Sequence, residues 1–90
     1  MNNIRRKEIR EIMEQLYEAE AKLVDAYDWI IQVNEQEEEY RDNIPENLLG
    51  SVRYEASEEA SYNMECAYDM LDGLSESIMG AINYLEEAVA

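Results

Sequence analysis

The chain has 90 residues, which is enough for one small domain at most. Its 22 acidic and 7 basic residues, with no histidine, give a net charge of −15 and exclude histidine-based catalysis. The single Cys66 excludes a disulfide framework and a cysteine-based zinc site. The apolar content of 47% distinguishes the chain from a disordered acidic tail, and no apolar run reaches the ~20 residues of a membrane span. We expect a cytoplasmic protein that does not enter a membrane.

The first predicted element is a helix over about residues 3–42. Asn2 or Asn3 can cap its start, and Pro45 favours an end near Asp42, because the residue before a proline is driven out of the α region. Apolar side chains recur along it at spacings of three and four, which is typical of a coiled-coil seam. The predicted seam of this helix consists of Ile9, Ile12, Leu16, Ala19, Leu23, Ala26, Ile30, Val33 and Tyr40.

A connection over residues 43–51 follows, and a second helix is predicted over about residues 52–89. Pro45 and Gly50 interrupt the helical pattern, and Ser51 can cap the second helix. The residues from Pro45 to Leu49 can form one short helical turn inside the connection. The predicted seam of the second helix consists of Ala60, Met64, Ala67, Leu71, Leu74, Ile78, Ala81, Leu85 and Ala88.

The fold class is all-α: a short connection makes two long helices antiparallel neighbours in one helical-hairpin, coiled-coil domain over residues 1–90. More apolar side chains occur than one seam uses, so we predict a homodimer that forms a four-helix bundle. A groove for a partner helix is the alternative, because Gly73, Ser77 and Gly80 would let another helix approach closely. Cys66 is expected to be a small core residue beside the seam. The flanks of the predicted seam comprise Met13, Tyr17, Val24, Tyr27, Trp29 and Ile31 in the first helix, and Met70, Tyr68, Met79, Ile82, Tyr84 and Val89 in the second.

Charge is distributed unevenly along the chain. After Arg53 no Lys or Arg occurs, while nine acids follow. The acids are predicted to form two solvent-facing ridges opposite the seam. The ridge of the first helix consists of Glu11, Glu14, Glu18, Asp25, Asp28, Gln32, Glu35 and Glu39, and that of the second of Glu55, Glu58, Glu65, Asp69, Asp72, Glu76 and Glu86.

The ridges favour mimicry of nucleic acid. Spread over a rod of ~50 Å, the acid excess amounts to about one charge per 3 Å, the same order as one per ~1.7 Å in duplex DNA. Such a surface would bind a basic groove on another protein and would repel nucleic acid itself. Solubility alone is the simpler explanation of the acidity, since high net charge keeps small proteins apart. The predicted partner-binding residues are Glu55, Glu58, Tyr62, Glu65, Tyr68, Asp69, Asp72 and Glu76.

A basic segment begins the chain and contains Arg5, Arg6, Lys7 and Arg10. Positive charge opposes the dipole at a helix N-terminus, but a hairpin places this end beside the C-terminus of the second helix. The segment is therefore expected to clamp onto Glu86 and Glu87. The alternative is an anion-binding patch, which would suit an oligomeric sponge for signalling nucleotides.

Catalytic chemistry has little support in the sequence, and we expect no enzyme and no cofactor. A thin hairpin offers no pocket that could separate the pKa values of two carboxyl groups. The acids at residues 35–39 lack the spacing of an EF-hand and would hold Ca²⁺ or Mg²⁺ loosely, so no metal site is predicted.

Several strings of the chain resemble short acidic helical proteins encoded by phages and prophages of Gram-positive bacteria. They are NNIRRKEIREI at the start, EEEYRDNIPENL at residues 37–48, RYEASEEA at 53–60 and YLEEA at 84–88. The second helix departs from this group at Tyr62, Met64, Cys66, Tyr68 and Met70. The group has no assigned activity, so the resemblance carries over no functional residues.

Small acidic phage proteins often block host machinery that handles nucleic acid, as anti-CRISPR proteins do. By this analogy the chain is expected to be a non-enzymatic phage-type inhibitor that blocks a basic, nucleic-acid-binding surface of a host protein. The alternative is a structural or assembly bundle that binds a partner helix through its apolar flank.

Overall fold

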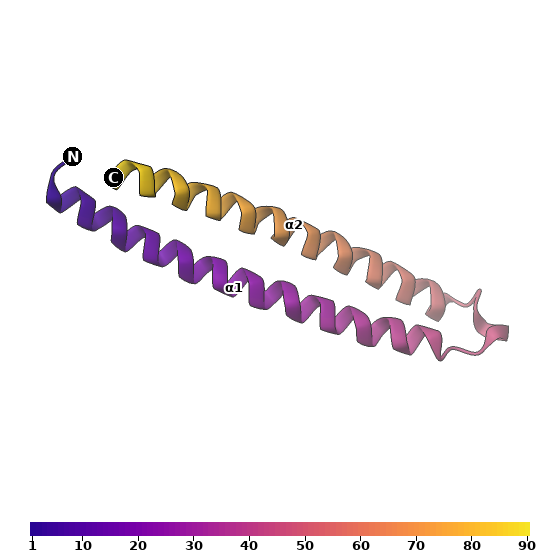
Figure 1. Cartoon of the computed structure of the whole chain (residues 1–90). Coiled ribbons are helices and arrows are strands. Elements are labelled where there is room, and N and C mark those ends of the chain that lie inside the picture. The colour runs from indigo at the N-terminus through magenta and orange to yellow at the C-terminus, as the bar shows by residue number, and fades with distance from the viewer.

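The computed structural model describes all 90 residues as two long helices joined by a short connection. Helix α1 spans Asn3–Asp42, the short 3-10 helix η1 spans Glu46–Leu48, and α2 spans Val52–Val89. Figure 1 shows α1 and α2 side by side and antiparallel, with both termini at one end. The predicted all-α hairpin is therefore confirmed, including the short helical turn in the connection.

Local hydrogen bonds fix the points at which the helices begin and end. The Asn2 side chain accepts a hydrogen bond from the backbone N–H of Arg5 at 2.8 Å, and Ser51 Oγ accepts one from the N–H of Tyr54 at 3.2 Å. Each of these caps satisfies a backbone donor that the first turn leaves free. At the end of α1, the Asn43 side-chain amide donates to a backbone carbonyl of the last turn at 2.9 Å.

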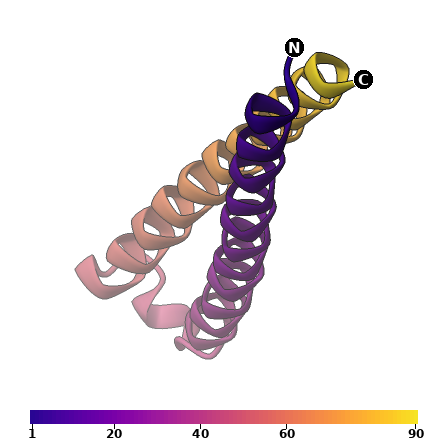
Figure 2. The ribbon, with the colours of Figure 1, turned by 90° about the vertical axis from the view of Figure 1, so that its left-hand side faces the viewer.

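The hairpin is a thin rod. Its Cα atoms extend over 70 × 14 × 14 Å, and Figure 2 shows the two helices inclined to each other. Neither helix combines the length and the apolar character needed to cross a membrane. A two-helix rod has a single internal seam, and of the hydrophobic side chains only Ile44 and Ile82 are buried.

Burial defines a seam with strict spacings of three and four. All of its members are buried or half-buried, and the contacts of Arg41 with Ser57 and Ser61, of Glu20 with Ser75 and of Tyr27 with Tyr68 join members of the seam. Helix α1 and the residue Ile44 that follows it contribute Ile9, Met13, Leu16, Glu20, Leu23, Tyr27, Ile30, Asn34, Glu37, Arg41 and Ile44 to the seam. Helix α2 contributes Tyr54, Ser57, Ser61, Met64, Tyr68, Leu71, Ser75, Ile78, Ile82, Leu85 and Val89.

This seam corrects every second position of the predicted one. Leu16 and Leu71, for example, lie in the seam as predicted. Glu20 takes the seam position predicted for Ala19, and Ser75 takes the one predicted for Leu74. The displaced residues lie on one flank of the seam and are Ile12, Ala19, Ala26, Val33, Tyr40, Ala60, Ala67, Leu74, Ala81 and Ala88. Conversely, Met13, Tyr27, Tyr68, Ile82 and Val89, predicted on the flanks, belong to the seam.

Polar contacts across the seam explain the displacement. Ser75 Oγ donates to Glu20 Oε1 at 2.6 Å, and the Tyr27 and Tyr68 rings meet edge to face with centroids 5.5 Å apart. A pattern search for apolar residues passes over such positions, because it treats serine and glutamate as solvent-facing. The seam accepts Glu20 and Ser75 because each finds its partner on the opposite helix.

The seam is most polar near the connection. Arg41 Nη1 donates to Ser61 Oγ at 2.8 Å, to Ser57 O at 3.1 Å and to Ser57 Oγ at 3.3 Å, and both serines are buried. Nearby, Asn34 is 5% exposed and its Oδ1 has no hydrogen-bond partner. Far from the connection the seam is apolar, and Ile82 is fully buried there.

One further prediction about α2 is wrong: Cys66 is exposed, so it is not a core residue. A Cβ atom added at Gly73 or Gly80 would meet no atom within 4 Å, so both glycines face open space and the predicted approach of a partner helix there stays a prediction. All three residues lie on the side of α2 that faces away from α1, where the true seam register places them.

Candidate interaction surfaces

The seam divides the rod into two sides. In heptad notation with Met13 at position a and Leu16 at d, position e follows d directly and position g precedes a directly. An antiparallel pair brings the e positions of both helices to one side and the g positions to the other. The Tyr17 hydroxyl donates to Glu86 Oε1 at 3.1 Å, which joins two e positions. The Arg53 guanidinium lies 5.5 Å from the centre of the Tyr40 ring, which joins two g positions.

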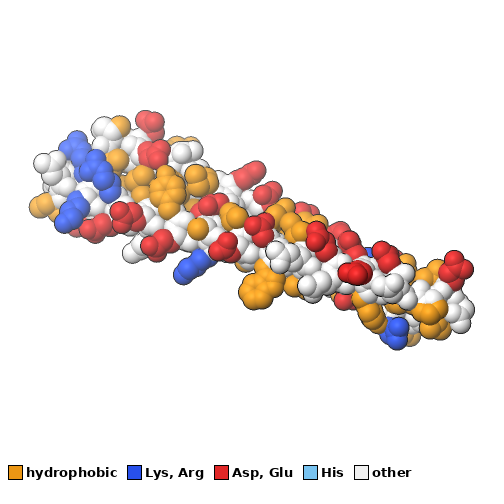
Figure 3. All heavy atoms as spheres, turned by 60° about the horizontal axis from the view of Figure 1, so that its bottom comes forward, with side chains coloured by type: hydrophobic (Ala, Val, Ile, Leu, Met, Phe, Trp, Pro, Cys, Tyr) orange, Lys and Arg blue, Asp and Glu red, His pale blue; other side chains and the backbone are white.

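Acidic residues gather on the e side. We call the e and b positions of both helices the acidic face, and more than half of the 22 acids lie there. All are exposed except Glu38, which is half-buried. They are Glu14, Asp28, Glu35, Glu38 and Asp42 from α1 and Glu55, Glu58, Glu65, Asp69, Asp72, Glu76 and Glu86 from α2. Figure 3 shows acidic side chains along the length of the rod.

A hollow of about 200 Å³ opens on the acidic face. It lies between the two helices, with Asp28 on one rim and Asp72 on the other, and the Tyr27 ring forms part of its wall. Two carboxylates beside an aromatic ring provide the two groups that attract a lysine or arginine side chain, an opposite charge and a π-face. The hollow can therefore accept a cationic side chain from another molecule.

The predicted partner-binding acids all belong to this face, whereas one of the two predicted tyrosines does not. Tyr62 is 64% exposed among the acids, and a hydrogen bond with the Cys66 thiol raises its pKa. Tyr68 was also predicted to bind a partner, but it is half-buried in the seam against Tyr27. Desolvation there raises its pKa, and the nearby Glu65 carboxylate adds to the effect.

The first-helix ridge is exposed as predicted and occupies b and f positions, on the side of α1 that faces away from the seam. It overlaps with the acidic face. Glu14, Asp28 and Glu35 belong to the acidic face, whereas the other members lie at f positions on the outer edge of α1. The acids are thus distributed over one face and its edges.

The basic segment lies at the end of the rod. Figure 1 shows that α1 begins beyond the end of α2, and Figure 3 shows Lys and Arg side chains gathered at this end. Arg6 Nη1 donates to Asn3 Oδ1 within its own helix, and Glu86 accepts from Tyr17. No hydrogen bond of the structure joins the segment to α2, so the predicted clamp onto Glu86 is not observed. Its four basic residues occupy different sides of α1: Arg5 at g, Arg6 at a, Lys7 at b and Arg10 at e.

The g side carries a second surface, whose g residues were predicted in the seam and whose c residues Trp29, Met70 and Tyr84 were predicted on its flanks. We call it the apolar face. It consists of Ile12, Ala19, Ala26, Trp29, Val33 and Tyr40 from α1 and Ala60, Ala67, Met70, Leu74, Ala81, Tyr84 and Ala88 from α2. Large side chains on it remain open to solvent: Trp29 is 70% exposed, Met70 76% and Tyr84 81%.

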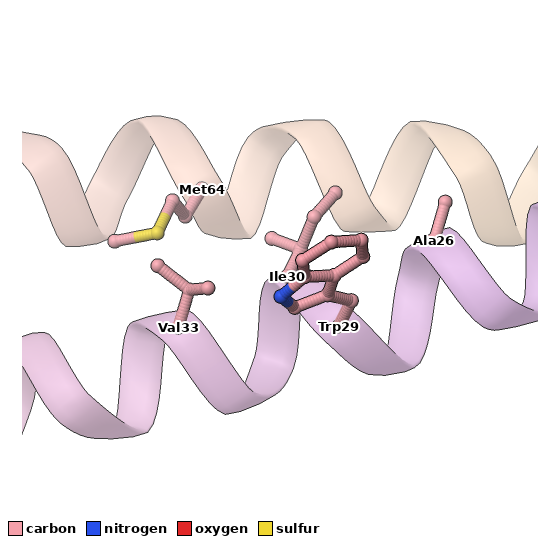
Figure 4. Close-up of a pocket in the computed structure, with 5 residues that line it drawn as sticks. All are labelled: Ala26, Trp29, Ile30, Val33 and Met64. Carbon is pink, nitrogen blue, oxygen red and sulfur yellow. The ribbon is translucent and has the colours of Figure 1, made fainter.

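A cavity of about 310 Å³ opens on the apolar face, and all five side chains that line it are hydrophobic. Figure 4 shows Val33, Ile30, Trp29 and Ala26 from α1 and Met64 from α2 around it. Only one acid, Glu8, occupies a g or c position of either helix. That absence of acids could have separated this face from the seam before the structure was known.

The carboxylates form no group of three or more that could hold a metal ion. Comparison of the chain with known protein families, curated proteins and solved structures gave no match. The resemblance to short acidic phage proteins therefore stays a prediction, and the function must be argued from the two faces.

Proposed function

We propose that the chain is a non-enzymatic interaction protein whose acidic face occupies a Lys- and Arg-lined, nucleic-acid-binding surface of another protein. The observation that carries the proposal is the segregation of charge: the acids gather on one face, while the opposite face is nearly free of them. Because more than half of the acids lie together along one side of the rod, a basic surface could contact many of them at the same time.

The charge density of the hairpin is that of a polyanion, although the charge per unit length is lower than the value estimated from the sequence. A net charge of −15 over 70 Å is about one charge per 5 Å, against one per ~1.7 Å for duplex DNA. The rod is longer than the ~50 Å assumed from the sequence, which lowers the density. Binding to a basic surface should still weaken steeply with salt, since it depends on screened charge.

Two matched triple variants test the proposal. The first neutralises the centre of the acidic face, with Glu58→Gln, Glu65→Gln and Asp72→Asn. The control removes the same charge from the f positions on the outer edges, with Glu18→Gln, Glu59→Gln and Glu87→Gln. All six carboxylates are exposed, so neither variant should disturb the seam.

Each protein is immobilised and used to capture partners from a lysate of a Gram-positive host at low and at high salt. The expected result is that the wild type and the control capture the same basic protein at low salt, that added duplex DNA displaces it, and that the first variant loses it. Equal capture by both variants, or equal loss from both, would show that no particular face is recognised.

The resemblance to phage proteins makes host defence nucleases guided by nucleic acid the first partners to test, in the cytoplasm of the host. A purified nuclease of this class should lose DNA binding when the wild type is added and keep it when the first variant is added. Inhibition by both would contradict a role for the acidic face.

The free basic segment supports a second candidate, a sponge for signalling nucleotides. Because no hydrogen bond ties it to α2, the cations at Arg5, Arg6, Lys7 and Arg10 remain available to an anion. A thermal-shift screen against cyclic nucleotides would detect binding as a rise in melting temperature. The absence of any shift would exclude this candidate.

A further inference from the structure

The isolated hairpin leaves an unusual amount of apolar surface uncovered. Its buried hydrophobic core amounts to Ile44 and Ile82, while Ile12, Trp29, Val33 and Leu74 on the apolar face are between 41% and 70% exposed. A single seam between two helices buries few side chains, and association can bury more without disulfides or metals. Something is therefore expected to cover this face.

The charge pattern indicates what that partner is. In a twofold-symmetric contact each group lies against the same surface of the other copy, so a self-pairing face cannot carry a large excess of one sign. The chain has 22 acids, yet only Glu8 lies at a g or c position, with Lys22, Arg5 and Arg53 as the cations. A basic partner would find almost no acid to recognise there, whereas a second copy would meet only a small excess of positive charge on this face.

The area is also sufficient. The face extends over 28 residues of each helix, about 42 Å at 1.5 Å per residue, and the rod is 14 Å wide. The product is roughly 600 Å² per copy, or about 1,200 Å² for two copies, which is the lower end of the range for a stable interface. Its apolar side chains come from both helices along the full seam. The cavity beside Trp29 and Val33 can receive a side chain from the opposite copy.

We propose that a second copy of this chain packs against the apolar face, so that two hairpins form a four-helix bundle with both acidic faces turned outward. The pairing stands independently of the proposed function. It would double the charge carried by one rod of the same length, to about one charge per 2 Å, close to that of duplex DNA.

Two substitutions of the same residue type test the pairing. Val33 on the apolar face and Val24 on the acidic face lie on the same helix and are both 41% exposed. Val33→Glu and Val24→Glu are therefore matched in chemistry, helix and exposure within the hairpin. Sedimentation equilibrium of the full chain measures the association constant, and circular dichroism checks that each variant is helical.

The wild type and Val24→Glu should sediment as dimers, and Val33→Glu should associate at least about a hundredfold more weakly, because two buried carboxylates would be left unpaired. A monomeric wild type, or the same association constant for both variants, would overturn the proposal. If Val33→Glu fails to fold, the milder Trp29→Gln replaces it: Trp29 is 70% exposed in the hairpin, so only pairing is expected to suffer.

The salt dependence of binding distinguishes the pairing of two copies from the proposed binding of a basic partner. Each copy carries −15, so added salt should strengthen self-association by screening the repulsion, whereas it should weaken binding to a basic partner. A dimer that dissociates with salt would contradict apolar pairing without bearing on the acidic face. Loss of partner capture with an unchanged dimer would contradict only the proposed function.

Discussion

Asn34 is the seam residue whose replacement tests the packing most directly. Its side chain is 5% exposed, Oδ1 has no hydrogen-bond partner, and Nδ2 makes one long contact of 3.4 Å to Glu38. Leucine has nearly the same shape without the polar atoms. We therefore expect Asn34→Leu to stabilise the protein.

The magnitude follows from two contributions. An unsatisfied buried acceptor costs about 1–3 kcal/mol, and burying a leucine side chain contributes about 1.5–3 kcal/mol, from which imperfect packing and the lost contact to Glu38 must be subtracted. A net gain of about 2–3 kcal/mol in the free energy of unfolding is expected. It corresponds to a rise in melting temperature of about 10–20 °C for a domain of this size.

Urea unfolding followed by circular dichroism measures the gain, and an unchanged m-value would show that the same surface is exposed on unfolding. Asn83→Leu is the matched control: Asn83 is exposed on α2, so the same substitution should change stability by less than about 0.5 kcal/mol. A loss of 1 kcal/mol or more in Asn34→Leu would refute the reasoning, because it would mean that the amide has an essential partner.

Three further predictions follow from contacts along the seam. Arg41→Met should lower the free energy of unfolding by about 1–3 kcal/mol in a urea titration, because it leaves buried serine hydroxyls such as that of Ser61 without their donor; no loss would contradict the polar network. Ile82→Ala should cost about 2–5 kcal/mol by thermal melting, since the side chain is 0% exposed, whereas the seam predicted from the sequence implies a small loss. The hydrogen bond to Glu86 raises the pKa of Tyr17, so its stabilisation is present below pH ~10 and is lost as pH rises through the raised pKa. Between pH 9 and 12 the wild type should therefore lose more stability in urea than Tyr17→Phe, and parallel pH profiles would contradict this.

The hairpin could be predicted because its signals are local. Proline and glycine cluster only around residues 45–50, caps precede both helices, and spacings of three and four extend along each. None of these signals depends on which residues meet across the seam. The number, length and direction of the helices therefore followed from the sequence.

The seam register could not be predicted, because it depends on pairs of residues far apart in the chain. Val33 fits an apolar pattern better than Asn34, and Tyr40 better than Arg41. The polar residue of each pair is nevertheless inside, and Arg41 is held there by two serines on α2. An apolar stripe beside the seam has the same periodicity as the seam itself, so periodicity alone cannot distinguish them.

The register error also determined which parts of the candidate surfaces could be predicted. The acids were correctly placed in solvent, since a carboxylate without a partner rarely lies inside. A tyrosine such as Tyr68, by contrast, is compatible with both an exposed and a buried position on a helix. Only the contact of Tyr68 with Tyr27 places it in the seam. The apolar face was predicted only in part. Trp29, Met70 and Tyr84 were placed on the flanks of the seam, and the surplus of apolar side chains predicted an interface, but the residues of this face at g positions were assigned to the interior.

The position of Trp29 gives the molecule a built-in optical reporter. It is the only tryptophan of the chain, and its indole projects from the apolar face with 70% of its surface in water. Indole emission moves to shorter wavelength when water is removed from the ring. The fluorescence spectrum of the unlabelled protein, recorded over a dilution series, therefore follows the hydration of that single face and is insensitive to events on the opposite side of the rod.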